Sequence, residues 1–372
     1  MRGQGPGRVY GRGGGPWYRR ALSLLLVLAA LQLGSLVSPA YACGCGAMVP
    51  SERTRITVGQ ETSVVHWDGR TEQIVMRLTV RGDAGEAAWI MPVPHRASVG
   101  LGDPALFEEL AAITAPVTET RHYFWPREGD WPLPQPDGAG APAPGAAPPV
   151  GVVDRQRLGP FDVARLTATD PQALRDWLDG HGFTLPGPLA SALEPYVDQG
   201  WEYVAVRLAP RKEGEVLAGA LEPLHLRFAS DRLVYPMRLS RLATTAQSLG
   251  LYVLADHRME PAGRIGGQEP RVTFAGRLES ADAGGAVGDL AGGGPAFLTA
   301  VVQDFPDPSR IDGDHELRAA GADTPYRSVI HRSELLTVGG FPVWLLTVLV
   351  VAGAAVTAVA VALRRRRGAV PA

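Results

Sequence analysis

The middle of the chain carries apolar residues with two different spacings. Residues 72–80 place Ile74, Met76 and Leu78 at every second position, which predicts a half-buried β-strand. Residues 201–208 are apolar on both faces, which predicts a central strand. Further runs with strand character lie at 89–94, 224–228, 251–254, 271–278 and 297–302. The prolines of the first of these runs confine it to a strand end or a sheet edge.

Three segments have the spacing of a helix. Asp103-Pro104 and Asp170-Pro171 each place a capping residue before proline, the arrangement that starts a helix, and apolar residues three or four apart follow both pairs. Residues 189–197 form a third such segment. Because strands come in runs and helices are clustered, the pattern predicts an α+β fold with mostly antiparallel strands and about three helices.

The start of the chain is continuously apolar behind a basic flank. Arg19 and Arg20 precede an apolar run over 21–37, and a small-residue Ala-Tyr-Ala pattern follows just before Cys43. This layout predicts a secretory signal peptide over residues 1–42. The strongly apolar centre favours the general secretory route over twin-arginine export.

A second uncharged apolar run covers residues 341–363. At about 1.5 Å per residue, a helix of about 23 residues is roughly 35 Å long, enough to cross a hydrocarbon core of about 30 Å. The run therefore predicts a transmembrane helix, the alternative being a buried core helix. A stop-transfer block follows it directly, made of Arg364, Arg365, Arg366 and Arg367. By the positive-inside rule, the basic tail 364–372 is cytoplasmic and residues 43–335 lie outside.

Charged residues are distributed unevenly between the outer segment and the two ends of the chain. Of the 36 Lys and Arg residues, five precede the predicted cleavage and four follow the span, whereas all 38 Asp and Glu residues lie between. The outer segment thus has 27 positive against 38 negative charges, a net of −11. This balance argues against nucleic acid as a partner and is compatible with cations or basic partners. The plain alternative is that the charge keeps the domain soluble.

Two stretches are poor in secondary-structure signals. The Pro-rich tract 126–150 cannot pair inside a sheet or form a helix, which predicts an exposed loop. The Gly-rich stretch 281–295 is predicted to be a similar loop. Because the pattern is alike on both sides of the first tract, residues 43–335 are predicted to form one extracytoplasmic α+β domain. Two lobes hinged at that tract are the alternative.

Several segments together resemble a known family. They are Cys43-Gly44-Cys45-Gly46, Trp67-Asp68-Gly69, Ala88-Trp89-Ile90-Met91-Pro92-Val93-Pro94 and Gly102-Asp103-Pro104-Ala105-Leu106. In these segments and most of the outer domain, the chain resembles the bacterial secreted family called domain of unknown function 2330 (DUF2330). The resemblance implies an extracytoplasmic bacterial domain, often followed by a C-terminal anchor. It implies no established activity or active site.

Cys43 and Cys45 are the only cysteines and lie at the predicted start of the mature chain, in an oxidising compartment. Four interpretations stay open. The pair forms a strained disulfide or is inert, Cys43 carries a lipid, both thiolates bind a metal, or the pair has a redox role. A lipid would need a lipobox that Ala-Tyr-Ala does not supply.

Other candidate chemistry is weak. One acidic stretch is a weak candidate for calcium, and it consists of Asp304, Asp307, Asp312, Asp314 and Glu316. Prolines 306 and 308 break the calcium-loop template, so a solvated turn is the alternative. The histidines are scattered, and neither a nucleophile elbow nor a phosphate loop is present. The sequence therefore indicates no cofactor and no catalytic residue.

Aromatic residues gather at the start of the Pro-rich tract, namely Tyr123, Phe124, Trp125 and Trp131. Exposed, they would form a patch for a glycan or a protein of the envelope. The alternative is that they cover the core.

These observations predict a single-pass protein of the bacterial cell membrane, with a binding or scaffolding module outside and a short cytoplasmic tail. Its expected partners are the membrane and an envelope protein or glycan. The alternative is an envelope enzyme, a hydrolase or a thiol- or metal-dependent one, that uses Cys43 and Cys45. The tail is too short to bury a core, so signalling would need a partner.

Overall fold

The computed structural model describes residues 42–43, 46–51, 54–130, 162–167, 171–210, 212, 214–279 and 285–367. The predicted signal peptide up to residue 41 lies outside these residues. So do Cys45, Trp131 and most of the Pro-rich tract.

A nine-stranded sheet forms the centre of the body. Its order is β18-β15-β16-β13-β3-β4-β11-β6, and β10 pairs with β4. The long hairpin β3–β4 is set by Asp68, whose carboxylate accepts hydrogen bonds from the backbone N–H groups of Arg70 and Thr71 at 2.9 and 2.7 Å. The strands are β3 (Ile56–Trp67), β4 (Thr71–Gly82), β6 (Ser98–Leu101), β10 (Gly219–Ala220), β11 (Leu224–Ala229), β13 (Gln247–Ala255), β15 (Arg271–Leu278), β16 (Ala296–Phe305) and β18 (Tyr326–Arg327).

A five-stranded antiparallel sheet packs on one face of this sheet. Its order is β1-β2-β5-β9-β8, with β1 (Ala42–Cys43), β2 (Gly46–Pro50), β5 (Ala87–Val93), β9 (Glu202–Leu208) and β8 (Asp162–Thr167). The expected edge position for residues 89–94 is wrong, because β5 lies inside the sheet. Pro92 is tolerated there because β2 pairs with β5 only as far as Ile90.

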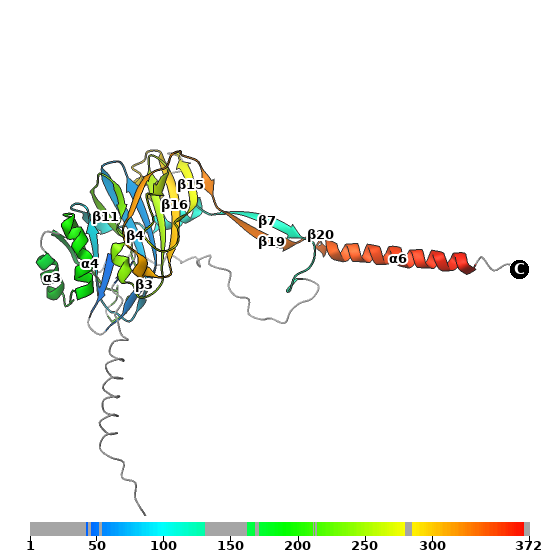
Figure 1. Cartoon of the computed structure of the whole chain (residues 1–372), viewed down its shortest axis with the longest axis horizontal. Coiled ribbons are helices and arrows are strands. Elements are labelled where there is room, and N and C mark those ends of the chain that lie inside the picture. Colours follow the sequence, from blue (N-terminus) through cyan, green and yellow to red (C-terminus); the bar gives the residue numbers. More distant parts are fainter. Residues whose placement is uncertain are drawn as a thin grey trace, which may run out of the picture.

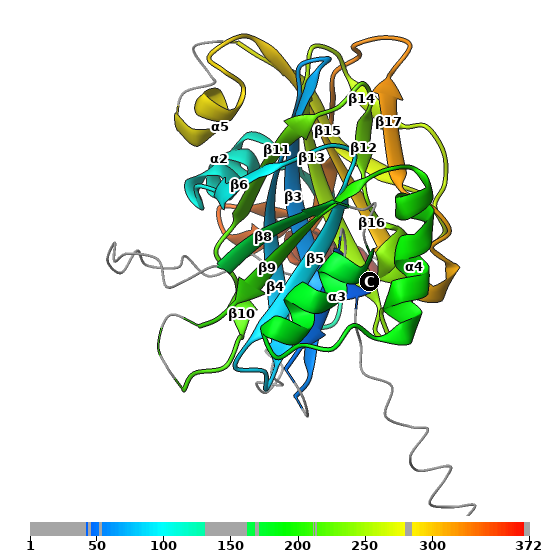
Figure 2. The ribbon, with the colours of Figure 1, turned by 90° about the vertical axis from the view of Figure 1, so that its left-hand side faces the viewer.

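Helices pack on the outer face of each sheet, and Figure 2 shows α3 and α4 in front of the smaller one. The core between the sheets includes Met76, Trp89 and Val206. The outer face of the small sheet packs on α3 (Pro171–Gly180) and α4 (Gly187–Asp198). The outer face of the large sheet packs on α2 (Ala105–Ile113) and α5 (Gly285–Leu290). A small sheet of β12 (Leu233–Tyr235), β17 (His315–Ala319) and β14 (Met259–Pro261) adds to the core between the sheets.

The predicted elements are largely present. The three predicted helices correspond to α2, α3 and α4, and the 3-10 helices η1 (Arg238–Leu242) and η2 (Pro308–Arg310) are additional. The chain is β-rich but not purely antiparallel. In the nine-stranded sheet β13 pairs with β3 in parallel, and outside it β7 (Val117–Tyr123) pairs with β19 (Val329–Leu335) in parallel. Pairing direction depends on partners distant in sequence, which a local pattern does not contain.

One loop prediction is wrong in its centre. Residues 285–290 of the Gly-rich stretch form α5, with Val287 and Leu290 buried against α2 and the sheet. The side chain of Glu109 caps this helix, accepting hydrogen bonds from the N–H groups of Ala286 and Val287 at 3.1 and 3.0 Å. The cap and the buried apolar face offset the low helix propensity of glycine.

A stalk leaves the body and ends in a long helix (Figure 1). It is a parallel ribbon of β7 (Val117–Tyr123) and β19 (Val329–Leu335), followed by the tight hairpin of β20 (Thr337–Val338) and β21 (Phe341–Pro342). The helix α6 (Val343–Arg367) comes next. Within the described part of the chain, it is the one helix long and apolar enough to cross a membrane, over Val343–Arg365, and its most apolar window is 0% buried.

Candidate functional site

A row of polar side chains crosses the outer face of the nine-stranded sheet beside α2 and α5. His66 in β3 lies opposite Gln73 in β4, and its Nδ1 is 3.1 Å from the Gln73 amide nitrogen. The Nε2 atom of His225 in β11 is 3.2 Å from the Gln73 amide oxygen. Because an amide nitrogen donates and an amide oxygen accepts, His66 accepts at Nδ1 and His225 donates from Nε2.

Both imidazoles are held in the neutral form. Burial lowers the pKa of His66 below 6.5, although nearby Asp68 and Asp256 act in the opposite direction. Burial also lowers the pKa of His225, and the positive charge of Arg227 adds to the effect. A neutral ring that donates from Nε2 keeps Nδ1 as an acceptor. His225 can therefore both donate and accept hydrogen bonds.

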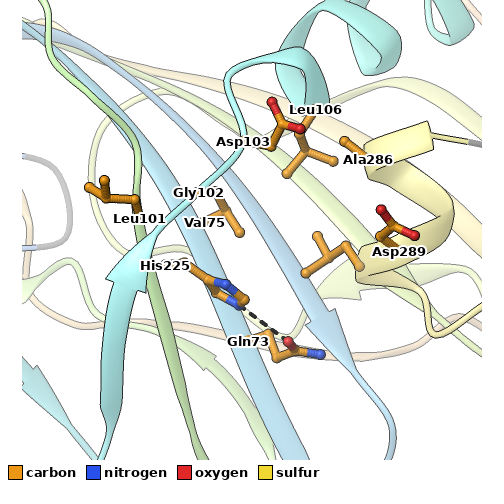
Figure 3. A pocket seen from close by; sticks show the side chains of 10 residues that line it. Gln73, Val75, Leu101, Gly102, Asp103, Leu106, His225, Ala286 and Asp289 are labelled. Atoms are coloured by element: carbon orange, nitrogen blue, oxygen red, sulfur yellow. Dashed lines mark hydrogen bonds between the residues drawn. The ribbon is translucent and has the colours of Figure 1, made fainter. Parts of the chain in front are cut away.

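A pocket of about 180 Å³ opens next to this row, between the sheet and the two helices (Figure 3). Gln73 and His225 come from neighbouring strands, whereas Asp103 lies in the loop before α2 and Asp289 lies on α5. Apolar side chains form the rest of the wall, namely Val75, Leu101, Leu106, Ala286 and Leu290, and Gly102 completes the lining.

Two local features shape the pocket. A Cβ atom on Gly102 would come within 2.4 Å of a methyl carbon of Val75, so only glycine lets this loop pass so close to β4. The N–H of Gly102 also donates to the carbonyl oxygen of Pro223 at 2.9 Å. On the other side, the Glu109 cap fixes α5 against α2, which sets the position of Asp289. These contacts therefore hold in place the backbone segments that carry the pocket lining.

The lining gives the pocket a defined chemical preference. It contains the carboxylates of Asp103 and Asp289 and no Lys or Arg. Its volume is below the roughly 300–1,000 Å³ of pockets for drug-sized ligands. The arrangement thus suits a small group that is cationic or rich in donors and has a short apolar part.

Other buried polar groups lie in the core and not in this pocket. The hydroxyl of Tyr235 donates to the carboxylate of Glu61 and lies 2.6 Å from the hydroxyl of Ser63. Glu72 is fully buried, and burial raises the pKa of its carboxyl well above 4.5. One oxygen of Glu72 accepts from the N–H of Val234 at 3.3 Å. These contacts join β3 and β4 to β12.

Acid is expected to destabilise the fold through His315. This residue is buried, and burial lowers the pKa of its imidazole from 6.5 to about 4. The unfolded chain therefore binds a proton at higher pH than the folded protein, so the contribution of this group to the free energy of unfolding falls between pH 6.5 and pH 4. The loss is roughly 2 to 3 kcal/mol between about pH 7 and pH 4.5.

Urea unfolding of wild type and His315→Gln at the two pH values measures this loss. The variant keeps a neutral polar group at the site and should lose less stability on acidification by that amount. Equal losses in both proteins would show that His315 does not carry the effect.

The candidate residues from the sequence are spread over the molecule. Cys43 lies in β1, where its backbone pairs with Gly46, on the sheet that does not form the pocket. Cys45 and Trp131 are outside the described residues. Tyr123, Phe124 and Trp125 lie at the far end of the stalk, away from the body (Figure 1).

The acidic candidates are engaged separately. Asp304 accepts from the hydroxyl of Ser248 at 2.8 Å, and Asp307 from that of Ser309 at 2.6 Å. Asp314 accepts from the hydroxyl of Tyr196 at 2.6 Å. Among the residues that the structure describes, no group of three or more His, Cys, Asp or Glu side chains is arranged to hold a metal.

The pocket residues were not predicted as a site. Asp103 is identified from the sequence only as a helix cap, a role it fills by accepting from the N–H of Ala105 at 2.9 Å. His225 appears only as a polar residue in the run 224–228. A polar residue that interrupts the apolar pattern of a sheet face covered by helices is the signal that points to such a site.

Comparisons with known proteins place the chain in a broader setting. A family model described as "Uncharacterized protein conserved in bacteria (DUF2330)" matches residues 39–318. A search of curated proteins found no match. Among solved structures, the crystal structure of baculovirus P35 aligns with 74% of this chain and 97% of its own, at 10% identity and a TM-score of 0.29. A likeness at that level carries no argument about fold or function.

Proposed function

The chain belongs to the DUF2330 family of uncharacterized proteins conserved in bacteria, and on this premise we propose that it is a binding module held at the outer face of the cell membrane by α6. In this proposal the ribbon of β7 and β19 is a stalk. The body carries the ligand site, which is the pocket beside Gln73 and His225.

The exposure of α6 carries the proposal of anchoring. None of its most apolar window packs on the body, so in water this surface would be fully hydrated. Its two hydroxyl groups are satisfied within the helix, since Thr347 donates to the carbonyl oxygen of Val343 and Thr357 to that of Gly353, both at 2.8 Å. A bilayer demands such internal satisfaction of polar groups.

Charge supports the orientation. The arginine block 364–367 follows the apolar segment directly, and basic flanks stay in the cytoplasm. The apolar run 21–37 behind Arg19 and Arg20 is typical of an export signal. Both features favour a body outside the cell membrane and a basic end inside.

The pocket supports binding rather than catalysis. Its lining, taken over the described residues, contains no Ser, Thr, Cys, Lys or Tyr side chain that could act as a nucleophile beside His225, and its two carboxylates come from separate helix ends. The lining combines the hydrogen-bond acceptors of two carboxylates with a set of apolar side chains. A small organic cation, such as the end group of a basic side chain, fits this chemistry.

Binding of n-butylguanidinium by the full-length protein tests the pocket. We expect it to bind more tightly than n-butylurea, which has a similar shape but no charge, in isothermal titration calorimetry. Asp289→Asn should weaken the cation about two- to fivefold, the range of an exposed charge pair. Asp198→Asn, an exposed acid on α4 in another layer, is the matched control and should change nothing. Equal binding of both probes, or of neither, would remove the pocket from the proposal.

A further inference from the structure

We propose that the end of the stalk is an interfacial anchor, whose aromatic side chains lie in the headgroup zone of the outer leaflet. We call this set the aromatic collar, and it consists of Tyr123, Phe124, Trp125, Phe341 and Trp344. The inference rests on the proposed anchoring by α6. It also gives the aromatic patch a lipid partner in place of the glycan or protein expected from the sequence.

Backbone hydrogen bonds connect the collar directly to the start of α6. The carbonyl oxygen of Tyr123 accepts from the N–H of Leu336 at 2.9 Å, and the carbonyl oxygen of Leu336 accepts from the N–H of Val343 at 2.9 Å. Hydrogen bonds between neighbouring chains run across the strand direction and bridge about 4.8 Å each, so Tyr123 lies to the side of the first residue of α6 and at nearly the same height. The headgroup zone on each side of the hydrocarbon core is about 5–8 Å thick. The collar therefore has the right height.

The collar exposes large apolar surface far from the body. Trp125 is 65% exposed and Phe341 is 56% exposed, and Phe124 meets Trp125 edge to face with ring centroids 5.1 Å apart. Val338, in the same terminal hairpin, is 62% exposed. Exposed rings with a polar edge are enriched where a membrane meets water, because one part is buried and another stays wet.

The polar groups around the collar suit the same zone. The guanidinium of Arg127 lies 4.0 Å from the centre of the Tyr123 ring, a position from which a cation reaches lipid phosphate. The nearby carboxylate of Asp130 is engaged by the hydroxyl of Tyr123 at 2.9 Å and by the N–H of Arg127 at 2.6 Å. These two hydrogen bonds stabilise the carboxylate within the turn.

Lipid explains the place of the collar better than a glycan does. The two strands of the stalk carry mainly polar and charged side chains between the body and this point, and the rings appear only where the membrane helix begins. An interfacial anchor must lie next to the start of the membrane helix, whereas a glycan-binding surface need not.

Depth-dependent fluorescence quenching tests the inference on the full chain. In a Cys43→Ser, Cys45→Ser background, one cysteine at a time carries a small environment-sensitive dye, at Trp125→Cys, Val348→Cys or Ser191→Cys. The proteins are reconstituted in vesicles of phosphatidylethanolamine and phosphatidylglycerol. Nitroxides are placed either at the headgroup or near the ends of the acyl chains. Val348 reports on α6, and the exposed Ser191 on α4 reports on the body.

The dye at 125 should be quenched several-fold more by headgroup nitroxide than by deep nitroxide. Deep nitroxide should quench the dye at 348 more strongly than the dye at 125, and neither nitroxide should quench the dye at 191. Quenching at 348 without quenching at 125 would overturn the collar and leave the anchor intact. No quenching at 348 would overturn the anchor itself. A dye at 125 that responds to soluble peptidoglycan fragments and not to lipid would assign the patch to a glycan and end the proposal.

A second measurement leaves the collar unlabelled. Quenching of native tryptophan fluorescence by lipids brominated near the headgroup should fall in Trp125→Ser relative to wild type, since one interfacial ring is removed. Trp177→Ser, on α3 in the body, serves as the control and should raise the lipid-quenched fraction slightly, because it removes a ring that lipid does not quench. A quenched fraction in Trp125→Ser that equals or exceeds that of wild type would contradict the collar.

Discussion

Removal of α6 should turn a membrane-bound protein into a soluble one. A chain that stops at Gly340 keeps the body and the ribbon but lacks the apolar segment Val343–Arg365. Because a membrane-spanning helix inserts almost irreversibly, the full chain should stay in the pellet after alkaline extraction. The truncated chain should move almost completely to the supernatant. Immunoblots of the two fractions measure the change.

Substitutions inside α6 test whether its hydrophobicity is needed for anchoring when its length is unchanged. Val350→Arg with Val356→Arg places two charges near the middle of α6, each at a cost of about 2.5 to 3.5 kcal/mol for insertion. This variant should be released like the truncated chain. Val350→Leu with Val356→Leu is its matched control and should stay in the membrane. A truncated chain that remains in the pellet would show that α6 is not the anchor.

Loss of the Trp89 ring should strongly destabilise the fold. The ring is fully buried in β5, and its cross-strand neighbours are Met48 in β2 and Val206 in β9, all in the core between the two sheets. Trp89→Ala should lower the free energy of unfolding by about 3 to 5 kcal/mol, through lost burial and the cavity left behind. That is a large part of a typical total of about 5–15 kcal/mol.

Trp89→Phe is the control for this effect. It keeps an aromatic ring between the sheets and removes the indole N–H, which has no hydrogen-bond partner among the described residues. Its cost should therefore be well below that of alanine. Urea unfolding followed by circular dichroism compares the two variants. Equal midpoints would contradict a tightly packed core between the sheets.

Local periodicity predicted the individual elements well. The alternating run 72–80 lies inside β4, because one face of that strand packs on the core between the sheets. Asp170-Pro171 marks the start of α3, and the third helical segment matches α4. These features depend on neighbours only a few residues away, which is the distance over which a pattern in sequence is informative.

Features that depend on distant segments were not predictable in the same way. The parallel pair β3–β13 joins residues about 190 positions apart along the chain, so nothing local to either strand sets its direction. The helix α5 forms in a Gly-rich stretch because Glu109, far away in sequence, caps it. In each case a tertiary contact overrides a weak local preference.

The candidate site illustrates the same limit. Its polar residues, Gln73, Asp103, His225 and Asp289, come from four separate elements or their flanks and share no motif. By contrast, the aromatic residues near 123–125 stood out in the sequence, and what the structure adds is their place beside the start of α6. The sequence identified this aromatic surface, and its position beside α6 suggests that lipid is its partner.

Labelling of single cysteines on cells tests the membrane topology most directly. In the Cys43→Ser, Cys45→Ser background, Ser191→Cys reports on the body and Ala369→Cys on the basic end of the chain. A membrane-impermeant maleimide added to intact spheroplasts should modify residue 191 at once, and residue 369 only after the membrane is permeabilised. Modification of residue 369 in intact spheroplasts, with residue 191 protected, would contradict a body held outside by α6.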